Sequence, residues 1–234
     1  KIRAAVKRVS PEKFLLGEVW EDATTKYGFG HRRTYLLGKG LDSVMNYPFK
    51  NAVLDFVKGK PAQQAMNEIL SICEHYPAPA LNTALNFLST HDTERALTVI
   101  ADEPANGRGR EWQSGRNVSG EAYEEGMLRL RMAYAIIYTL PGLPCLYYGD
   151  EIGMQGYRDP FNRGYYCWDS HEERLKPVLA QLAQLRHSCE AFRTGALRVL
   201  RAEGGVLHYQ RVGAAETAEI IVNRSEHIIV EPLA

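Results

Sequence analysis

The sequence predicts an α/β fold followed by a small all-β region. Two observations support this prediction. Short apolar, strand-like runs alternate with helical patterns four times up to about residue 189, and only strand patterns with turn residues between them follow. Buried strands separated by helices are typical of a parallel sheet with both faces covered. We therefore expect two domains, residues 1–189 and residues 190–234.

The first part of the chain holds two of the four expected strands. Apolar residues at helical spacing predict a helix over 1–9, which Pro11 ends. Apolar runs then predict strands over 14–19 and 42–48. The segment 21–40 lies between them, has no clear period and contains four glycines, so we expect a long loop. Loops of this length are often functional.

The remaining elements follow in the same alternation. We expect helical segments at 52–57 and 65–73, a third strand at 85–89 and a loop at 102–120. A long helix at 121–140, apolar on most of its circumference, leads to a fourth strand at 144–148. A second loop at 154–168 and an amphipathic helix at 172–189 follow. Beyond the boundary near residue 190, we expect short strands at 197–199, 206–209, 218–222 and 228–230.

The composition argues against several classes of partner. Lys plus Arg and Asp plus Glu number 28 each, which disfavours a nucleic-acid or anionic-membrane surface. No apolar run approaches the roughly 20 residues that span a bilayer. The four cysteines share no metal-type spacing, which favours free thiols and a cytoplasmic location. The chain begins at Lys1 without the apolar region of a signal peptide, so we expect an excerpt of a longer protein.

Polar residues stand at the end of each expected strand. The carboxyl ends of parallel strands share one rim, and ligands bind there. In chain order these ends are Glu18, Asn46-Tyr47, His91-Asp92 and Asp150-Glu151. All of them except Asn46-Tyr47 carry a carboxylate. We therefore expect a functional site on this rim.

Two carboxylates facing each other across a cleft are what glycoside hydrolysis requires. One donates a proton to the leaving oxygen, and the other supports the cationic sugar ring. Glu18 and Asp92 suit these roles by position, and Trp20 and Tyr47 would offer aromatic faces to sugar rings. Two alternatives stay open: ordinary ion-paired strand ends, and a divalent-metal site.

Five segments resemble the α-amylase family, glycoside hydrolases built on a TIM-type barrel. Gly17-Glu18-Val19-Trp20 is similar to the segment with the general acid/base Glu, and 87–92 to the one with the His and the transition-state-stabilising Asp. Ser89-Thr90 stand where many members have an Asn before the His. Segment 142–151 resembles the family's eighth strand, and 159–163 resembles the segment with the Asp and Arg that hold sugars. Segment 42–49 resembles the sixth strand in the neopullulanase and cyclomaltodextrinase branch.

The resemblance implies a fold and a set of roles. The chain would supply strands 5 to 8 of a (β/α)8 barrel and part of the C-terminal β-domain. Glu18 would donate a proton and later accept one from water, and Asp92 and His91 would bind hydroxyls of the attacked sugar and help to keep Glu18 protonated. The other implied roles are sugar positioning by Asp159 and Arg163, a leaving-group contact by Trp20, structural roles for Asp150 and Glu151, and an ion pair for Arg95.

The implied substrates are α-glucans: starch, pullulan, cyclodextrin or maltooligosaccharides, cut at α-1,4 bonds, with α-1,6 bonds as a second option. The family's nucleophile lies in a segment of the form Asp-Gly-x-Arg-x-Asp, and none occurs in the 234 residues. We expect that segment upstream, together with any calcium ligands, and no cofactor in this chain. A retaining mechanism needs the nucleophile, so we expect the chain alone to be inactive.

Two other expectations follow from half a barrel. Its open sheet edges would favour self-association. The alternative function is a non-catalytic sugar- or partner-binding subunit of the same fold, and a metal-dependent barrel enzyme is a third interpretation.

Overall fold

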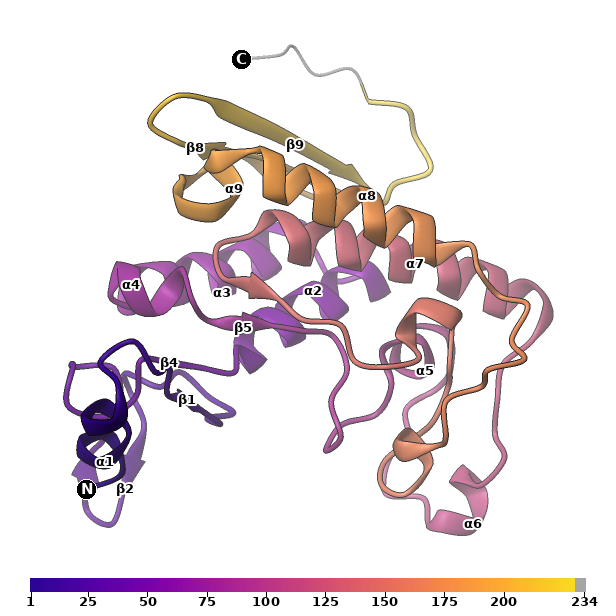
Figure 1. The fold of residues 1–234 in the computed structure, drawn as a ribbon. Coiled ribbons are helices and arrows are strands. Elements are labelled where there is room, and N and C mark those ends of the chain that lie inside the picture. The colour runs from indigo at the N-terminus through magenta and orange to yellow at the C-terminus, as the bar shows by residue number, and fades with distance from the viewer. Residues whose placement is uncertain (230–234) are drawn as a thin grey trace.

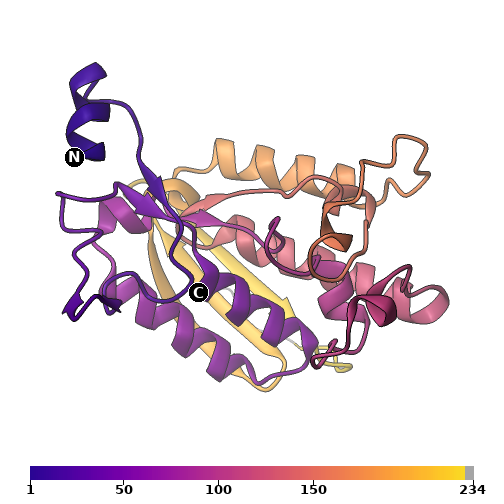
Figure 2. The same ribbon diagram turned by 90° about the horizontal axis from the view of Figure 1, so that it is seen from below.

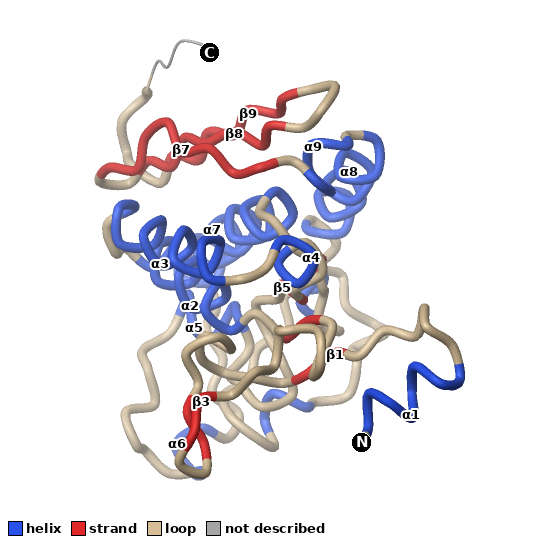
Figure 3. The backbone as a smooth tube through the Cα atoms, turned by 90° about the vertical axis from the view of Figure 1, so that its left-hand side faces the viewer, coloured by secondary structure: helices blue, strands red, loops and turns tan. Residues whose placement is uncertain are grey.

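A computed structural model of the chain describes residues 1–229. Figure 1 shows three layers: an antiparallel sheet on one side, long helices in the middle, and short parallel strands with their loops on the other. Figure 3 shows the same order of layers from the side. No helix in residues 1–229 is both long enough and apolar enough to cross a bilayer.

The elements of the described part agree with most of the predicted segments. The helices are α1 (Ile2–Val9), α2 (Tyr47–Lys58), α3 (Ala62–His75), α4 (Ala78–Leu81), α5 (Ala96–Ala101), α6 (Arg110–Gln113), α7 (Gly120–Thr139), α8 (Leu175–Ser188) and α9 (Glu190–Thr194), with 3-10 helices η1 (Asp150–Ile152) and η2 (Phe161–Arg163). The strands are β1 (Leu16–Gly17), β2 (Tyr27–Gly28), β3 (His31–Arg32), β4 (Ser43–Val44), β5 (Leu85–Asn86), β6 (Leu143–Pro144), β7 (Ala196–Glu203), β8 (Val206–Val212) and β9 (Thr217–Asn223).

Four of these strands lie side by side in parallel. β1 pairs with β4, a bridge joins Met45 beside β4 to Leu85 of β5, and β5 pairs with β6. The order β1-β4-β5-β6 is the order of the chain, as the alternation of strands and helices predicted. All four strands therefore end at one rim, where Glu18, Asn46, His91 and Asp150 follow.

The parallel strands are shorter than the sequence predicted. Tyr47 and Pro48 belong to the first turn of α2 because Asn46 caps that helix, its side chain accepting a hydrogen bond from the backbone N–H of Phe49 (3.3 Å). The predicted strand 144–148 is wrong beyond Pro144. Its two tyrosines lie in the following turn, where their rings pack on Arg95.

The prediction that both faces of the parallel sheet are covered by helices is wrong for residues 1–229. The long helices α2, α3, α7 and α8 lie on one side, between the parallel strands and the antiparallel sheet (Figures 1 and 3). Loops lie on the other side, and apolar side chains near the strands stay exposed there, among them Phe14, Leu143 and Leu146.

The segments expected to be loops contain short elements. β2 and β3 form an antiparallel hairpin within 21–40, and α6 lies within 102–120. The N-terminal helix α1 stands apart from the helical layer (Figure 2) and has no buried residue. Asp42 binds it by ion pairs to Arg3 (2.6 Å) and Lys7 (2.9 Å).

The C-terminal strands form one antiparallel sheet in the order β7-β8-β9. Two buried arginines connect α7 to its surroundings: Arg211 of β8 donates to the carbonyls of Thr139 and Gly195, and Arg186 of α8 donates to that of Tyr138 (2.8 Å). The sheet begins after α9, a few residues beyond the boundary expected near 190. The strand expected at 228–230 is wrong for Ile228 and Ile229, and Val230 lies outside the described residues.

Candidate active site

The first part of the site is built around Glu18, which directly follows β1. Its Oε1 accepts hydrogen bonds from Nε1 of Trp20 (3.0 Å) and from the hydroxyl of Tyr47 (2.9 Å). The two rings stack with centroids 4.5 Å apart, and Tyr47 is only 2% exposed. Burial, with a further contribution from the Glu18 carboxyl, raises the pKa of the Tyr47 phenol well above its ordinary value. The phenol therefore stays protonated and remains a hydrogen-bond donor.

The second part of the site lies on the segment after β5. His91 Nε2 lies 3.2 Å from Asp92 Oδ2. Nη2 of Arg163 donates to Asp92 Oδ1 (3.1 Å), and its Nε donates to the carbonyl of His91 (2.9 Å) and lies 2.9 Å from Asp159 Oδ1. One guanidinium therefore holds both carboxylates that the sequence selected on this side.

A buried amide fixes the backbone of this segment. Asn162 is 0% exposed, and its Nδ2 donates to the carbonyls of Thr90 (3.3 Å), His91 (2.8 Å) and Thr93 (2.7 Å). Three carbonyls converging on one donor group hold the turn that presents His91 and Asp92. Sequence reasoning placed Asn162 in a loop motif but gave it no role.

The two parts converge on one point. One side-chain oxygen or nitrogen from each of Glu18, His91 and Asp92 lies within 4.8 Å of the others. All three residues are exposed, so a ligand can reach them. The carboxyl groups of two different strand ends thus face one another beside an aromatic pair, as a glycosidase requires.

The same three residues also satisfy the spacing of a metal site, which the sequence left open. Several of their lone pairs are already engaged: Asp92 accepts from Arg163, and Trp20 and Tyr47 both donate to Oε1 of Glu18. The guanidinium of Arg163 also places a positive charge against Asp92, which opposes a cation. The arrangement fits sugar hydroxyls better than a metal ion.

A buried ion pair lies beside the site. Arg95 Nη1 is 3.3 Å from Asp150 Oδ1, and the hydroxyl of Tyr134 donates to Asp150 Oδ2 (2.6 Å). Burial outweighs these partners and raises the pKa of the Asp150 carboxyl to about 6. Asp150 is 1% exposed and Arg95 is 0% exposed, so neither is accessible to a substrate. This agrees with the structural role expected for Asp150 and the ion pair expected for Arg95.

The structure brings all the predicted site residues onto one rim. Glu18, Trp20 and Tyr47 form one cluster, and the other predicted residues, His91, Asp92, Asp159 and Arg163, form the second. Lys50 and Asn162 were missed. Lys50 lies one helical turn after Tyr47, which places it on the same side of α2, but this spacing does not by itself indicate that the lysine is buried.

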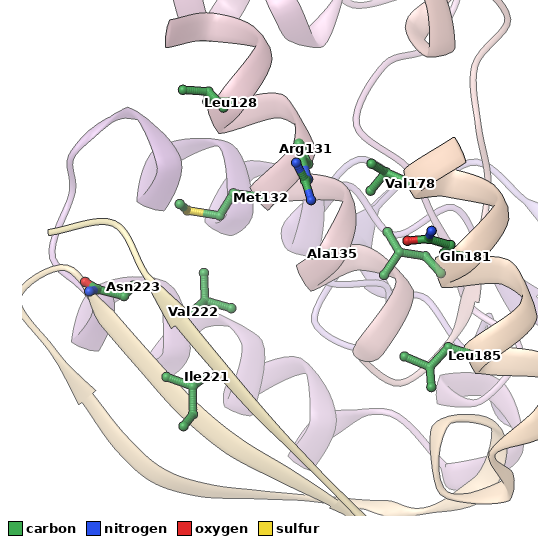
Figure 4. A pocket seen from close by; sticks show the side chains of 11 residues that line it. Leu128, Arg131, Met132, Ala135, Val178, Gln181, Leu185, Ile221, Val222 and Asn223 are labelled. Carbon is green, nitrogen blue, oxygen red and sulfur yellow. The ribbon is translucent and has the colours of Figure 1, made fainter. Parts of the chain in front are cut away.

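A pocket of about 660 Å³ elsewhere in the described part of the chain does not contain this chemistry. It lies between α7, α8 and β9, and Figure 4 shows mainly apolar side chains around it, such as Leu128, Val178 and Ile221. None of the described residues around it is a carboxylate, a histidine or a cysteine. We therefore place the active site at the rim.

Comparison with known proteins identifies the family of the chain. Residues 1–194 match the family described as "Alpha amylase, catalytic domain". A cyclomaltodextrinase of Geobacillus thermopakistaniensis is 31% identical over 239 residues, covering 100% of this chain and 35% of that protein. Neopullulanase 2 of Thermoactinomyces vulgaris is 31% identical over 207 residues, covering 87% of this chain and 30% of that protein.

A solved structure has a similar fold. The ligand-free cyclic α-maltosyl-(1→6)-maltose hydrolase of Arthrobacter globiformis superposes with a TM-score of 0.78 at 27% identity, covering 96% of this chain and 45% of that one. The chain thus spans about a third of the length of the cyclomaltodextrinases and neopullulanase that it matches.

A rim of parallel strands with paired carboxylates is an arrangement found in barrel-type glycoside hydrolases. The chain belongs to the α-amylase family, in its neopullulanase/cyclomaltodextrinase-like branch.

Proposed function

We propose that this chain carries the general acid/base of a retaining α-glucan hydrolase that cuts α-1,4 bonds, with α-1,6 bonds as a second option. The observation that carries the proposal is the convergence of Glu18, His91 and Asp92 within 4.8 Å beside the Trp20–Tyr47 stack. Starch, pullulan, cyclodextrins and maltooligosaccharides are the candidate substrates, and the names of the relatives support this class.

The geometry suggests how the residues divide the work. Glu18 donates its proton to the glycosidic oxygen and then takes one from the attacking water. Its Oε1 is held by Trp20 and Tyr47, so Oε2 is the oxygen left to exchange the proton. Asp92 and His91 bind hydroxyls of the sugar under attack. Arg163 holds Asp159 and Asp92 in place, and both it and Asp159 are exposed to a neighbouring glucose unit.

The proposal includes a position within the barrel. The four parallel strands would correspond to strands 5 to 8, and the β7-β8-β9 sheet to part of a C-terminal β-domain. No Asp-Gly-x-Arg-x-Asp segment occurs in the 234 residues, so the nucleophile would come from outside them. The isolated chain would then bind α-glucans but not hydrolyse them.

Two measurements test the proposal. Calorimetric titration of the purified chain with maltooligosaccharides should detect binding, and a reducing-sugar assay of the same sample should detect no turnover. Robust hydrolysis by the 234-residue chain would contradict the claim that the nucleophile lies elsewhere. Failure to bind any α-glucan would contradict the proposed function itself.

The alternative is a non-catalytic sugar- or partner-binding subunit, and the missing nucleophile segment is the observation that favours it. The reading frame of the full-length protein separates the two. An upstream Asp-Gly-x-Arg-x-Asp segment would support the hydrolase, and its absence there would support the binding subunit.

A further inference from the structure

A second pocket, of about 480 Å³, opens directly beside the active site. Trp20, Tyr47 and Asp92 of the active site line it, together with Lys50 and Asn51 of α2. Because Trp20, Tyr47 and Asp92 belong both to the active site and to the lining of this pocket, a ligand bound at Glu18 and Asp92 can extend into the pocket.

Lys50 is the unusual group in the pocket. Lys50 is only 7% exposed. Within the described part of the chain, its ammonium group makes no hydrogen bond and no ion pair. Burying a charge without a partner costs free energy. The packing of α2 does not require an ammonium group at this position, so a ligand is the natural partner for it.

The charges around Lys50 select the chemistry of that ligand. Asp55 on α2 and Asp92 and Glu94 after β5 face the pocket, while Arg158 supplies a second cation, with its Nε 3.7 Å from Glu94 Oε1. Each of these carboxylates already has a cation beside it, Asp55 having Lys60 and Asp92 having Arg163, so the pocket carries charges of both signs and no surplus of positive charge selects a phosphate or another anion. Closely mixed donors and acceptors fit a neutral ligand that both donates and accepts hydrogen bonds, which is the property of a sugar.

Trp20 completes the argument for a sugar. Its ring is stacked against Tyr47, yet the residue is 49% exposed, so much of its surface is open to a ligand. An exposed indole beside hydrogen-bonding groups suits the apolar face and the hydroxyls of a glucose ring.

We propose that Lys50 determines substrate specificity by donating hydrogen bonds to the hydroxyls of a glucose unit seated against Trp20, in a subsite that extends the cleft from Glu18 and Asp92. This inference rests on the proposed function, because it assumes an α-glucan at the active site. It predicts that longer maltooligosaccharides, which reach this subsite, gain affinity that depends on Lys50.

The test is calorimetric titration of the full 234-residue chain with maltooligosaccharides of two to seven glucose units. Lys50→Met keeps the aliphatic stem and removes the ammonium group. Loss of a hydrogen bond from a charged donor should weaken binding of the longer oligosaccharides about tenfold or more. Lys58→Met, at an exposed position of the same helix, should bind as the wild type does.

Asn51→Ala provides an independent test, because Asn51 is exposed on α2 and its truncation leaves no cavity in the core. We expect a loss of a few-fold with the longer oligosaccharides. If Lys50→Met does not fold, wild-type affinity in Asn51→Ala would overturn the subsite, and a wild-type affinity that does not fall through about pH 8 would overturn the role of Lys50.

The pH dependence of binding separates a direct role from a structural one. Burial lowers the pKa of the Lys50 ammonium group to about 8, against the opposing effect of Glu94 and Asp55. Asp92, Arg158 and Tyr47 are the other titratable groups lining the pocket. Wild-type affinity for longer oligosaccharides should fall as pH rises through about 8, and that of Lys50→Met should not.

The possible outcomes are distinct. Equal affinities of the wild type and Lys50→Met would overturn the role of Lys50 while leaving the proposed function intact. A wild type that binds no α-glucan of any length would overturn both.

Discussion

The hydroxyl of Tyr47 donates a hydrogen bond to Oε1 of Glu18 over 2.9 Å, joining the first turn of α2 to the end of β1. Nε1 of Trp20 donates to the same oxygen (3.0 Å). Within residues 1–229, Oε2 of Glu18 accepts no hydrogen bond. The carboxyl group is therefore held on one side and free on the other, which is the arrangement that a proton donor to substrate needs.

Tyr47→Phe should weaken this arrangement without disturbing the aromatic stack. The variant loses one partly buried hydrogen bond to an acidic side chain, so the free energy of unfolding should fall by about 1 kcal/mol. Urea unfolding followed by fluorescence measures it. Tyr165→Phe is the control because Tyr165 is 99% exposed, and it should unfold as the wild type does. Equal loss in both variants would mean that the Tyr47–Glu18 bond contributes nothing.

Glu18→Gln in the full-length protein should remove nearly all hydrolytic activity. Glutamine keeps the shape of the side chain but cannot transfer the proton, and general acid/base catalysis contributes about 10²- to 10⁴-fold. The rate of release of reducing sugar from maltooligosaccharides is the measurement. Glu12→Gln, at an exposed position before β1, should keep full activity. An active, folded Glu18→Gln enzyme would exclude Glu18 as the acid/base.

The rim could be predicted from sequence because its carboxylates immediately follow apolar runs. Glu18 directly follows β1, so the strand end fixes its place; His91 and Asp92 lie in the segment after β5, where the predicted strand end was enough to place them on the same rim. Tyr47 was expected to end a strand, but the cap formed by Asn46 makes it the first residue of a helix instead. It still reaches the rim, since the start of that helix lies at the end of β4.

The residues that support the rim could not be predicted from the sequence. Asn162 bonds carbonyls 69 to 72 positions earlier in the chain, a contact that only the tertiary fold creates. Lys50 looks like a surface residue of an amphipathic helix, because nothing in its neighbours reveals the packing that buries it. The position of the helices on one side of the parallel strands likewise depends on how successive strand–helix units curve, and the apolar periodicity of the sequence does not specify that curvature.

Asp150 should impose a pH dependence on stability in the acid range. Its pKa is raised by burial from 3.8 to about 6, so between these values the folded protein holds a proton that the unfolded chain has lost. Its stabilising contribution is therefore full below about pH 4 and declines as pH rises to about 6. Urea unfolding of Asp150→Asn across this range should lack the decline seen in the wild type. Asp169→Asn, at an exposed site, should retain it, and a wild-type slope in Asp150→Asn would contradict the assignment.

Lys50→Met should make the protein more stable at neutral pH. The folded-state pKa of Lys50 is about 8 against an ordinary 10.5, so from pH 8 to 10.5 the unfolded chain binds a proton that the folded protein does not. Wild-type stability should therefore rise over that window. Removing the buried charge should raise the free energy of unfolding by on the order of 1–3 kcal/mol at pH 7, and the gain should vanish near pH 10.5. Lys58→Met should show no gain; a destabilised Lys50→Met at pH 7 would mean that the ammonium group has a stabilising partner.

The free edges of the parallel strands should make the isolated chain self-associate. Among residues 1–229, β1 pairs only with β4 and β6 only with β5, so each presents an unpaired edge there. Leu143 in β6 is 42% exposed and Phe14 near β1 is 49% exposed, which adds apolar surface beside those edges. Light scattering should show a mass that increases with concentration. Leu143→Lys places a charge on the β6 edge and should shift the chain toward monomer, while Leu128→Lys, on α7 and 66% exposed, should not. A wild-type monomer at high concentration would show that these edges are protected without a partner.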